Sequence, residues 1–327
     1  MEAVNLKSSL ENAVPIVELK NITSREMDYL GDNHFSHILK DITFSIYEGE
    51  IFGLGSKTIN EAVVLSEIIA NIRPYYSGEC AVLGETLKRK KRLPTERIYY
   101  IDSHTMLFDN MTVLEYLMLL TTDKSIDDPQ LKLEILEKLD KFGLDYLSLS
   151  VIGKLSPTEK ILIELFSSLY TNSVLFIVNC VKYEFSGSEI AILKNIANEI
   201  KMQKLTMFLV TKQPKIIGII CDKVAYISGG KLLYCGEVND LIKKKDNIRF
   251  LINDSNLKEI YKKLLKKIPE YIYNLTENTL FVIDNFERSE NLFLAQMAVN
   301  NIIPDRIKVN RGRVENSFER LDNENEL

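Results

Sequence analysis

The 327-residue chain is long enough for one large domain and a smaller one, and its hydrophobic fraction of 46% is typical of a globular protein. Its net charge of −5 argues against a general nucleic-acid binder. No apolar run reaches the roughly 18–20 residues that cross a bilayer, and the N-terminal residues contain no apolar signal-peptide core. We therefore expect a cytosolic protein.

Cysteine and histidine usage gives no sign of a disulfide framework or a metal centre. The four cysteines are far apart and form no C-x-x-C pair, so we expect reduced thiols. Three histidines are too few for a site built on imidazole, and the pair His34 and His37 falls in a polar segment. We predict that the chain holds no metal of its own.

The N-terminal third is expected to be rich in strands. Residues 1–14 have the composition of a loose tail, and 16–19 begin a strand. A polar loop is expected at 24–37. Residues 40–47 alternate apolar and polar side chains, which indicates a half-buried strand.

Residues 49–79 carry the pattern around which the remaining elements are organised. An apolar strand at 50–54 is followed by a turn and a helical pattern, which is the setting of a phosphate-binding loop, G-x-x-x-x-G-K-[ST]. The turn contains one glycine, Lys57 comes too early to meet a phosphate, and spacing places the lysine–serine pair on Glu61 and Ala62. The candidates for any remaining nucleotide contact here are Gly55, Lys57, Thr58, Asn60, Glu61 and Ala62. The frame predicts a nucleotide-binding fold that no longer binds nucleotide in the usual way.

The middle of the chain mixes short strands with helices. Strands are expected at 80–83 and 97–101, and helices at 112–120 and 128–142. The basic run at 88–92 fits either a solvated turn or a contact with anionic lipid headgroups.

A capped helix is predicted at 154–170. Ser156 suits the N-cap, Pro157 the first helical position, and Glu159 the reciprocal position of a capping box.

Continuous apolar runs at 174–178 and 206–211 fit central parallel strands covered on both faces. A helix at 188–201 lies between them, and a hairpin follows through Gly229-Gly230. Alternating strands and helices indicate an α/β domain over residues 15–243.

After a charged segment at 243–246, the pattern changes to that of a small α+β domain, residues 244–327. Its expected strands lie at 247–252, 279–284 and 305–309, and its expected helices at 257–268, 291–301 and 314–321.

The joint order of several segments resembles one family. These segments are ILKDITFSIYEGEIFGL, SGECAVLGE, MTVLEYL, CDKVAYISGGKLLYCGEV and SFERL. Over residues 15–327 the chain resembles the ATP-binding subunit of an ATP-binding cassette (ABC) transporter, of the type paired with separate permeases in bacitracin and lantibiotic export. The resemblance implies a P-loop NTPase-like fold with a mixed sheet core, a helical subdomain over about 104–160 and a small C-terminal α+β domain.

The resemblance also places the family's functional positions. The Q-loop glutamine falls on Ser103, the Walker B aspartate on Asn179, the catalytic glutamate on Cys180, the D-loop aspartate on Ser186 and the switch histidine on Lys212. The signature LSGGQ reads Leu155–Glu159, and Tyr29 and Phe35 are candidates for the aromatic that stacks on adenine.

These replacements predict the loss of hydrolysis at the chain's own site. Mg²⁺ prefers charged oxygen ligands, whereas Ala62 supplies none and Asn179 only a neutral amide. A buried thiol at Cys180 cannot serve as a carboxylate base, and Lys212 cannot act as a neutral imidazole. We expect no cofactor on this chain, with ATP and Mg²⁺ possible only through a partner subunit.

The signature segment allows two interpretations. In the family this segment faces the nucleotide of the partner subunit, and Ser156 is retained for such a contact. Pro157 and Thr158 replace glycines and hinder close approach, while Glu159 adds negative charge. Alternatively, the segment simply caps its helix.

Two functions from different classes fit these features. The first is a non-catalytic transporter subunit that pairs with an ATPase-competent homologue and lies at the cytoplasmic membrane face through a permease. The resemblance implies permease contacts at Met106, Leu107, Phe108 and Met111, although the same residues also fit a core. The second is a soluble regulatory or scaffold protein of the same fold without a permease. An active ATPase is a third possibility.

Overall fold

The computed structural model describes residues 14–29, 35–87, 97–102, 107–121, 129–243, 248–276, 278–283, 290–309 and 314–326. The chain divides into two compact units, the first extending to Glu237 and the second comprising Val238–Glu324. Each unit has its own buried apolar cluster. Within the described ranges, no helix is both long and apolar enough to cross a membrane.

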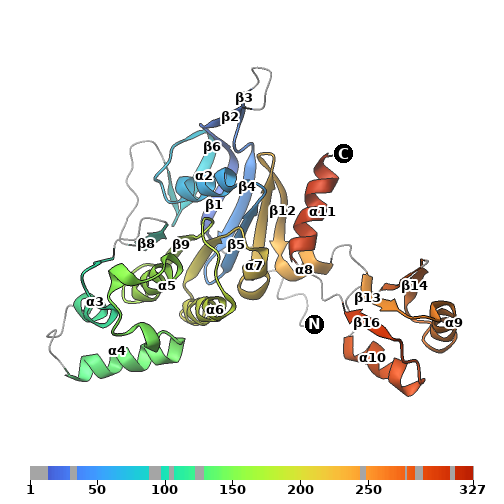
Figure 1. The fold of residues 1–327 in the computed structure, drawn as a ribbon. Helices are drawn as coiled ribbons and strands as arrows, with labels where there is room; N and C mark the ends of the chain where they lie inside the picture. The colour runs from blue at the N-terminus through green and yellow to red at the C-terminus, as the bar shows by residue number, and fades with distance from the viewer. Residues whose placement is uncertain are drawn as a thin grey trace, which may run out of the picture. The chain divides into compact units, whose positions relative to one another are not determined.

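A six-stranded sheet forms the centre of the first unit, in the order β12-β11-β5-β10-β9-β8 (Figure 1). Its strands are β5 (Ile51–Ser56), β8 (Ile98–Ile101), β9 (Leu175–Asn179), β10 (Thr206–Val210), β11 (Lys223–Ser228) and β12 (Lys231–Glu237). All neighbouring strands run parallel except β11 and β12, which form the predicted hairpin. Strands β9 and β10 are buried along their whole length, which confirms the prediction from their continuous apolar runs.

A four-stranded antiparallel sheet, β4-β1-β6-β7, lies on the other side of helix α2 (Ile59–Ile69). Its strands are β1 (Pro15–Ser24), β4 (Ile42–Tyr47), β6 (Tyr75–Val82) and β7 (Glu85–Thr86). Ile42, Phe44 and Ile46 are buried on one face of β4, as their alternation predicted. Together with α2 and the facing side of the six-stranded sheet they form one core. That core fixes where α2 begins.

The loop predicted at 24–37 is wrong in part, because it contains a two-stranded hairpin. Strand β2 (Met27–Tyr29) pairs with β3 (Phe35–His37), and Tyr29 lies opposite Phe35. The strands are only three residues long, too short for a period-two pattern to be recognised.

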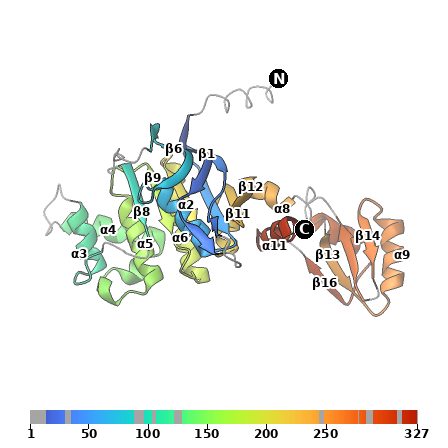
Figure 2. The ribbon, with the colours of Figure 1, turned by 90° about the horizontal axis from the view of Figure 1, so that it is seen from above.

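The helices of the first unit cover the six-stranded sheet or extend beyond its β8 edge. They are α3 (Val113–Leu120), α4 (Pro129–Phe142), α5 (Pro157–Ser168), α6 (Gly187–Met202) and α7 (Pro214–Ile220), with short 3₁₀ turns at η2 (Asp145–Leu147) and η3 (Ile152–Lys154). Helices α6 and α7 pack on β10 and β5, whereas α3 and α4 lie beyond β8 (Figures 1 and 2). We did not predict α7 from the sequence, because its seven residues are shorter than a typical amphipathic pattern.

The second unit is an antiparallel sheet in the order β14-β15-β13-β16. Its elements are α8 (Val238–Lys243), β13 (Ile248–Asn253), α9 (Leu257–Lys267), β14 (Ile272–Leu275), β15 (Leu280–Ile283), α10 (Glu290–Val299), β16 (Arg306–Val309) and α11 (Val314–Glu326). The central six elements follow the β-α-β-β-α-β arrangement. Leu264 of α9 and Phe293 of α10 are buried against Phe250 and Ile252 of the sheet. The α+β character matches the prediction, except that β14 was missed.

Candidate functional site

The ends of three neighbouring parallel strands bring the predicted nucleotide positions together. Val210 at the end of β10 pairs with Leu54 of β5 on one side and with Asn179 of β9 on the other. Because the carboxyl ends of parallel strands meet at one edge, ligands in open α/β sheets bind there. The segments after β5, β9 and β10 therefore form the candidate site.

The connection between β5 and α2 is too short to wrap a phosphate. Strand β5 ends at Ser56 and Thr58 is already the N-cap of α2, so that Lys57 alone lies between them. The Lys57 N–H donates to the Ile227 carbonyl oxygen at 2.9 Å, and Gly55 lies within β5, paired with Tyr226. A phosphate-binding loop instead leaves its backbone N–H groups directed at the ligand.

The N-terminus of α2 is closed by a carboxylate of the chain itself. The Glu61 side chain accepts the Thr58 N–H at 2.9 Å, while the Thr58 hydroxyl accepts the Glu61 N–H at 3.4 Å. The second Glu61 oxygen accepts the Gly230 N–H, from the β11–β12 turn, at 2.7 Å. Glu61 is 3% exposed. A negative charge therefore lies at the position to which spacing assigned the lysine of a phosphate-binding loop.

Asn60 and Ala62 flank Glu61 in the first turn of α2, and neither carries a carboxylate or a hydroxyl group. Asn60 is exposed, whereas Ala62 is buried in the core. An alanine methyl group cannot replace the hydroxyl with which a phosphate-binding loop holds Mg²⁺.

Asn179 is used as a structural hydrogen-bonding residue. It is 7% exposed, and its amide nitrogen donates to Ser66 Oγ at 3.1 Å and to the Tyr100 hydroxyl at 3.4 Å. Its carbonyl oxygen accepts the Val181 N–H at 3.4 Å. These bonds join β9 to α2 and β8 through a neutral group, where a magnesium site requires a carboxylate.

Cys180 has no access to a water molecule in the candidate site. Its side chain is fully buried, and its thiol donates to the Val210 carbonyl oxygen at 3.2 Å. Burial raises the pKa of the Cys180 thiol to about 12. A protonated, buried thiol cannot act as a general base near neutral pH.

The segment after β10 is held to the segment after β9 by side chains. Lys212 forms an ion pair with Glu184 at 3.1 Å, and both side chains are exposed, so the pair contributes little to stability. Gln213 bonds both backbone groups of Phe185, accepting its N–H at 2.8 Å and donating to its carbonyl at 3.2 Å. We did not identify Gln213 from the sequence, because the contact joins residues that are distant along the chain.

The signature segment caps α5, as predicted. Ser156 is the N-cap, Pro157 occupies the first turn, and the Glu159 carboxylate accepts the Ser156 N–H at 2.8 Å. The Thr158 hydroxyl donates to the Glu189 carboxylate of α6. Ser186, at the D-loop position, is itself the N-cap of α6.

Two groups of predicted contact residues come from other segments of the chain. Tyr29 and Phe35 form an exposed ring pair with centroids 5.4 Å apart on the β2–β3 hairpin. Phe108 is 55% exposed beside the Tyr116 ring, while Leu107 and Met111 are half-buried. Ser103 and Met106 lie outside the described residues.

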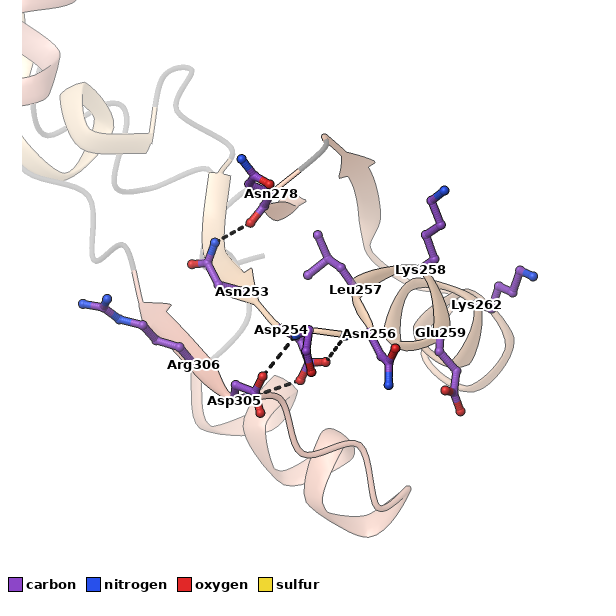
Figure 3. A pocket seen from close by; sticks show the side chains of 11 residues that line it. Asn253, Asp254, Asn256, Leu257, Lys258, Glu259, Lys262, Asn278, Asp305 and Arg306 are labelled. Carbon is purple, nitrogen blue, oxygen red and sulfur yellow. Dashed lines mark hydrogen bonds between the residues drawn. The ribbon is translucent and has the colours of Figure 1, made fainter.

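A polar hollow of about 820 Å³ lies in the second unit, at the end of β13 and the start of α9 (Figure 3). Asp254 accepts the Asp305 N–H at 2.9 Å, and Asp305 accepts the Ser255 N–H at 3.1 Å. These carboxylates brace the surrounding loops. Across the described ranges, no group of three or more His, Cys, Asp or Glu side chains is arranged to hold a metal ion. We did not predict this hollow from the sequence.

The fold is that of an ABC nucleotide-binding domain. It matches a dimeric ATP-binding cassette solved in a post-hydrolysis state with ADP and phosphate, with a TM-score of 0.54 and 16% identity over 68% of this chain and 98% of that chain. It also matches cbiO1 of Clostridium perfringens, part of an ABC transporter complex, with a TM-score of 0.54 and 16% identity over 78% of this chain and 96% of that chain.

In sequence, the chain is similar to ATP-binding subunits of ABC transporters. It is 26% identical to an uncharacterized ABC transporter ATP-binding protein of Methanocaldococcus jannaschii, over 75% of this chain and 86% of the relative. It is 25% identical to a methionine import ATP-binding protein of Cupriavidus necator, over 79% of this chain and 76% of the relative. No family model matches the chain.

Proposed function

We propose that this chain is a non-catalytic nucleotide-binding-domain subunit of an ABC transporter of the bacitracin and lantibiotic export type. It docks a membrane permease at the cytoplasmic face and pairs with an ATPase-competent homologue. The observation that carries the proposal is the closed start of α2, where one residue separates strand from cap and the Glu61 carboxylate accepts the Thr58 and Gly230 N–H groups.

The neighbouring positions support the same conclusion. Asn179 is neutral and fully used in hydrogen bonds, and Cys180 is buried and protonated. Hydrolysis in this fold needs a metal, a phosphate cradle and an oriented water molecule. The groups present at these positions do not supply these three requirements. We therefore assign ATP hydrolysis to the partner subunit.

The isolated chain is expected to release phosphate from Mg-ATP no faster than buffer does. A steady-state phosphate-release assay tests this expectation, with a cassette ATPase as the positive control. Turnover in the usual enzyme range of about 1–10³ per second would contradict the proposal.

Docking to a permease is tested by co-purification from native membranes. Phe108, Leu107 and Met111 present apolar surface beside α3, which suits a contact with a permease. We expect a complex with a permease and with a homologue that has an intact phosphate-binding loop. Recovery of this chain without any membrane protein would favour the regulatory or scaffold alternative.

Within such a complex, the start of α5 is proposed to approach the partner's nucleotide. Replacing Glu159→Gln is expected to tighten nucleotide binding to the complex, since the amide keeps an acceptor for the Ser156 N–H and removes a negative charge. Ser156→Ala is expected to weaken binding or leave it unchanged. Equilibrium binding to the purified complex measures both effects, and tighter binding after Ser156→Ala would refute this arrangement.

A further inference from the structure

The N-terminus of α2 differs from the other capped helices in how its carboxylate is placed. In the part of the chain that the structure describes, four helices share the same capping box, with Glu61, Glu115, Glu159 and Glu189 at its third helical position. Glu61 is buried, whereas Glu115 is exposed and the other two are half-buried. Its second oxygen also accepts an N–H from a distant segment, at Gly230.

The cost of burying a carboxylate makes this placement informative. A buried charge is stable only where hydrogen bonds and local dipoles compensate for the lost water. Here the compensation comes from the Thr58 and Gly230 N–H groups together with the positive end of the α2 dipole. These are the kinds of groups that bind a phosphate at a helix N-terminus.

We propose that the Glu61 carboxylate is a built-in anion that takes the place of a phosphate group at the start of α2 and excludes external phosphates from it. This inference rests on the proposed function, because it explains how the fold keeps α2 in position without a nucleotide. Proteins often gain specificity by excluding a wrong ligand. Here the negative charge of the Glu61 carboxylate, already in the site, repels an external phosphate.

The same contact fixes the position of α2 relative to the β11–β12 turn. The Gly230 carbonyl oxygen accepts the Lys40 N–H at 2.7 Å, so both the N–H and the carbonyl group of Gly230 are hydrogen-bonded and hold the turn in place. Removing the carboxylate leaves the Thr58 and Gly230 N–H groups without their acceptor and directed at the volume that the carboxylate filled. Glu61 is therefore a specificity-determining residue whose replacement opens an anion site.

The test compares the full-length wild type with Glu61→Ser, Glu61→Gln and the matched control Glu115→Ser. The control removes the same capping-box carboxylate from α3, where it is exposed and accepts hydrogen bonds from Thr112 at the start of the same helix. The probe is millimolar sodium pyrophosphate without Mg²⁺, against sodium chloride at matched ionic strength. Circular dichroism checks that each variant is folded.

We expect pyrophosphate to raise the melting temperature of Glu61→Ser by about 2–4 °C, and that of Glu61→Gln by less, because the amide still fills the space. Wild type and Glu115→Ser should not respond. In wild type, hydrogen exchange at the Thr58 and Gly230 amides should be slow and unchanged by pyrophosphate.

The outcomes separate this inference from the proposed function. If both folded Glu61 variants ignore pyrophosphate, the built-in anion is wrong, while the non-catalytic function stands. If pyrophosphate stabilises wild type or alters exchange at these amides, Glu61 does not exclude phosphate and the inference also fails. ATP hydrolysis by wild type would overturn the proposed function instead.

Discussion

Replacing Cys180→Glu is expected to destabilise the first unit by about 3–5 kcal/mol and to produce no ATPase activity. The substitution would restore the carboxylate at the position that resembles the catalytic glutamate. However, Cys180 directly follows β9, its side chain is fully buried, and its thiol donates to the Val210 carbonyl oxygen of β10. The larger side chain must either bury an unpaired charge or disrupt the contact between these strands.

Urea unfolding followed by circular dichroism measures this effect. The matched control is Cys235→Glu, which introduces the same side chain at an exposed cysteine of β12 and should change stability by no more than about 0.5 kcal/mol. A Cys180→Glu protein as stable as wild type would show that this side chain can reach the solvent. The assignment of Cys180 to the core would then be wrong.

Replacing Gly230→Ala is expected to destabilise the first unit by about 2–4 kcal/mol. Gly230 has φ of +78°, a left-handed conformation that costs a residue with a Cβ about 1–2 kcal/mol. An added Cβ would also lie 2.8 Å from the Ile38 carbonyl oxygen, closer than a carbon and an oxygen can approach. The turn must then shift, which weakens its bond to Glu61.

Gly229→Ala is the control for Gly230→Ala. Gly229 has φ of +60°, but an added Cβ there meets no heavy atom closer than 3.9 Å. We expect Gly229→Ala to destabilise the first unit only by the conformational cost of about 1–2 kcal/mol. Equal losses at the two glycines, measured by thermal or urea unfolding, would show that the β11–β12 turn is not held in the position described.

The elements that were predicted correctly are those whose signals are local. The cap of α5 involves residues three positions apart, and the buried strands β9 and β10 are marked by their own apolar runs. The β11–β12 hairpin follows from two consecutive glycines. By contrast, the three-residue strands β2 and β3 and the seven-residue helix α7 are too short for their periodicity to be distinguished from chance.

At the candidate site, the residue types alone limit the possible chemistry. Asparagine at 179 and cysteine at 180 are not carboxylates in any fold, and glutamate at 61 cannot supply the positive charge of a lysine. These limits follow from the side-chain groups themselves, so the sequence was sufficient to state them.

The use of these groups depends on contacts between distant segments. Glu61 meets Gly230 across 169 positions, and Asn179 meets Ser66 across 113. The turn after β5 could equally have left Glu61 in solvent, since a capping box needs only local bonds. Packing of α2 between two sheets buries its carboxylate and selects its second partner, because a buried charge must find a donor within the fold. That requirement has no signature in the sequence around Glu61.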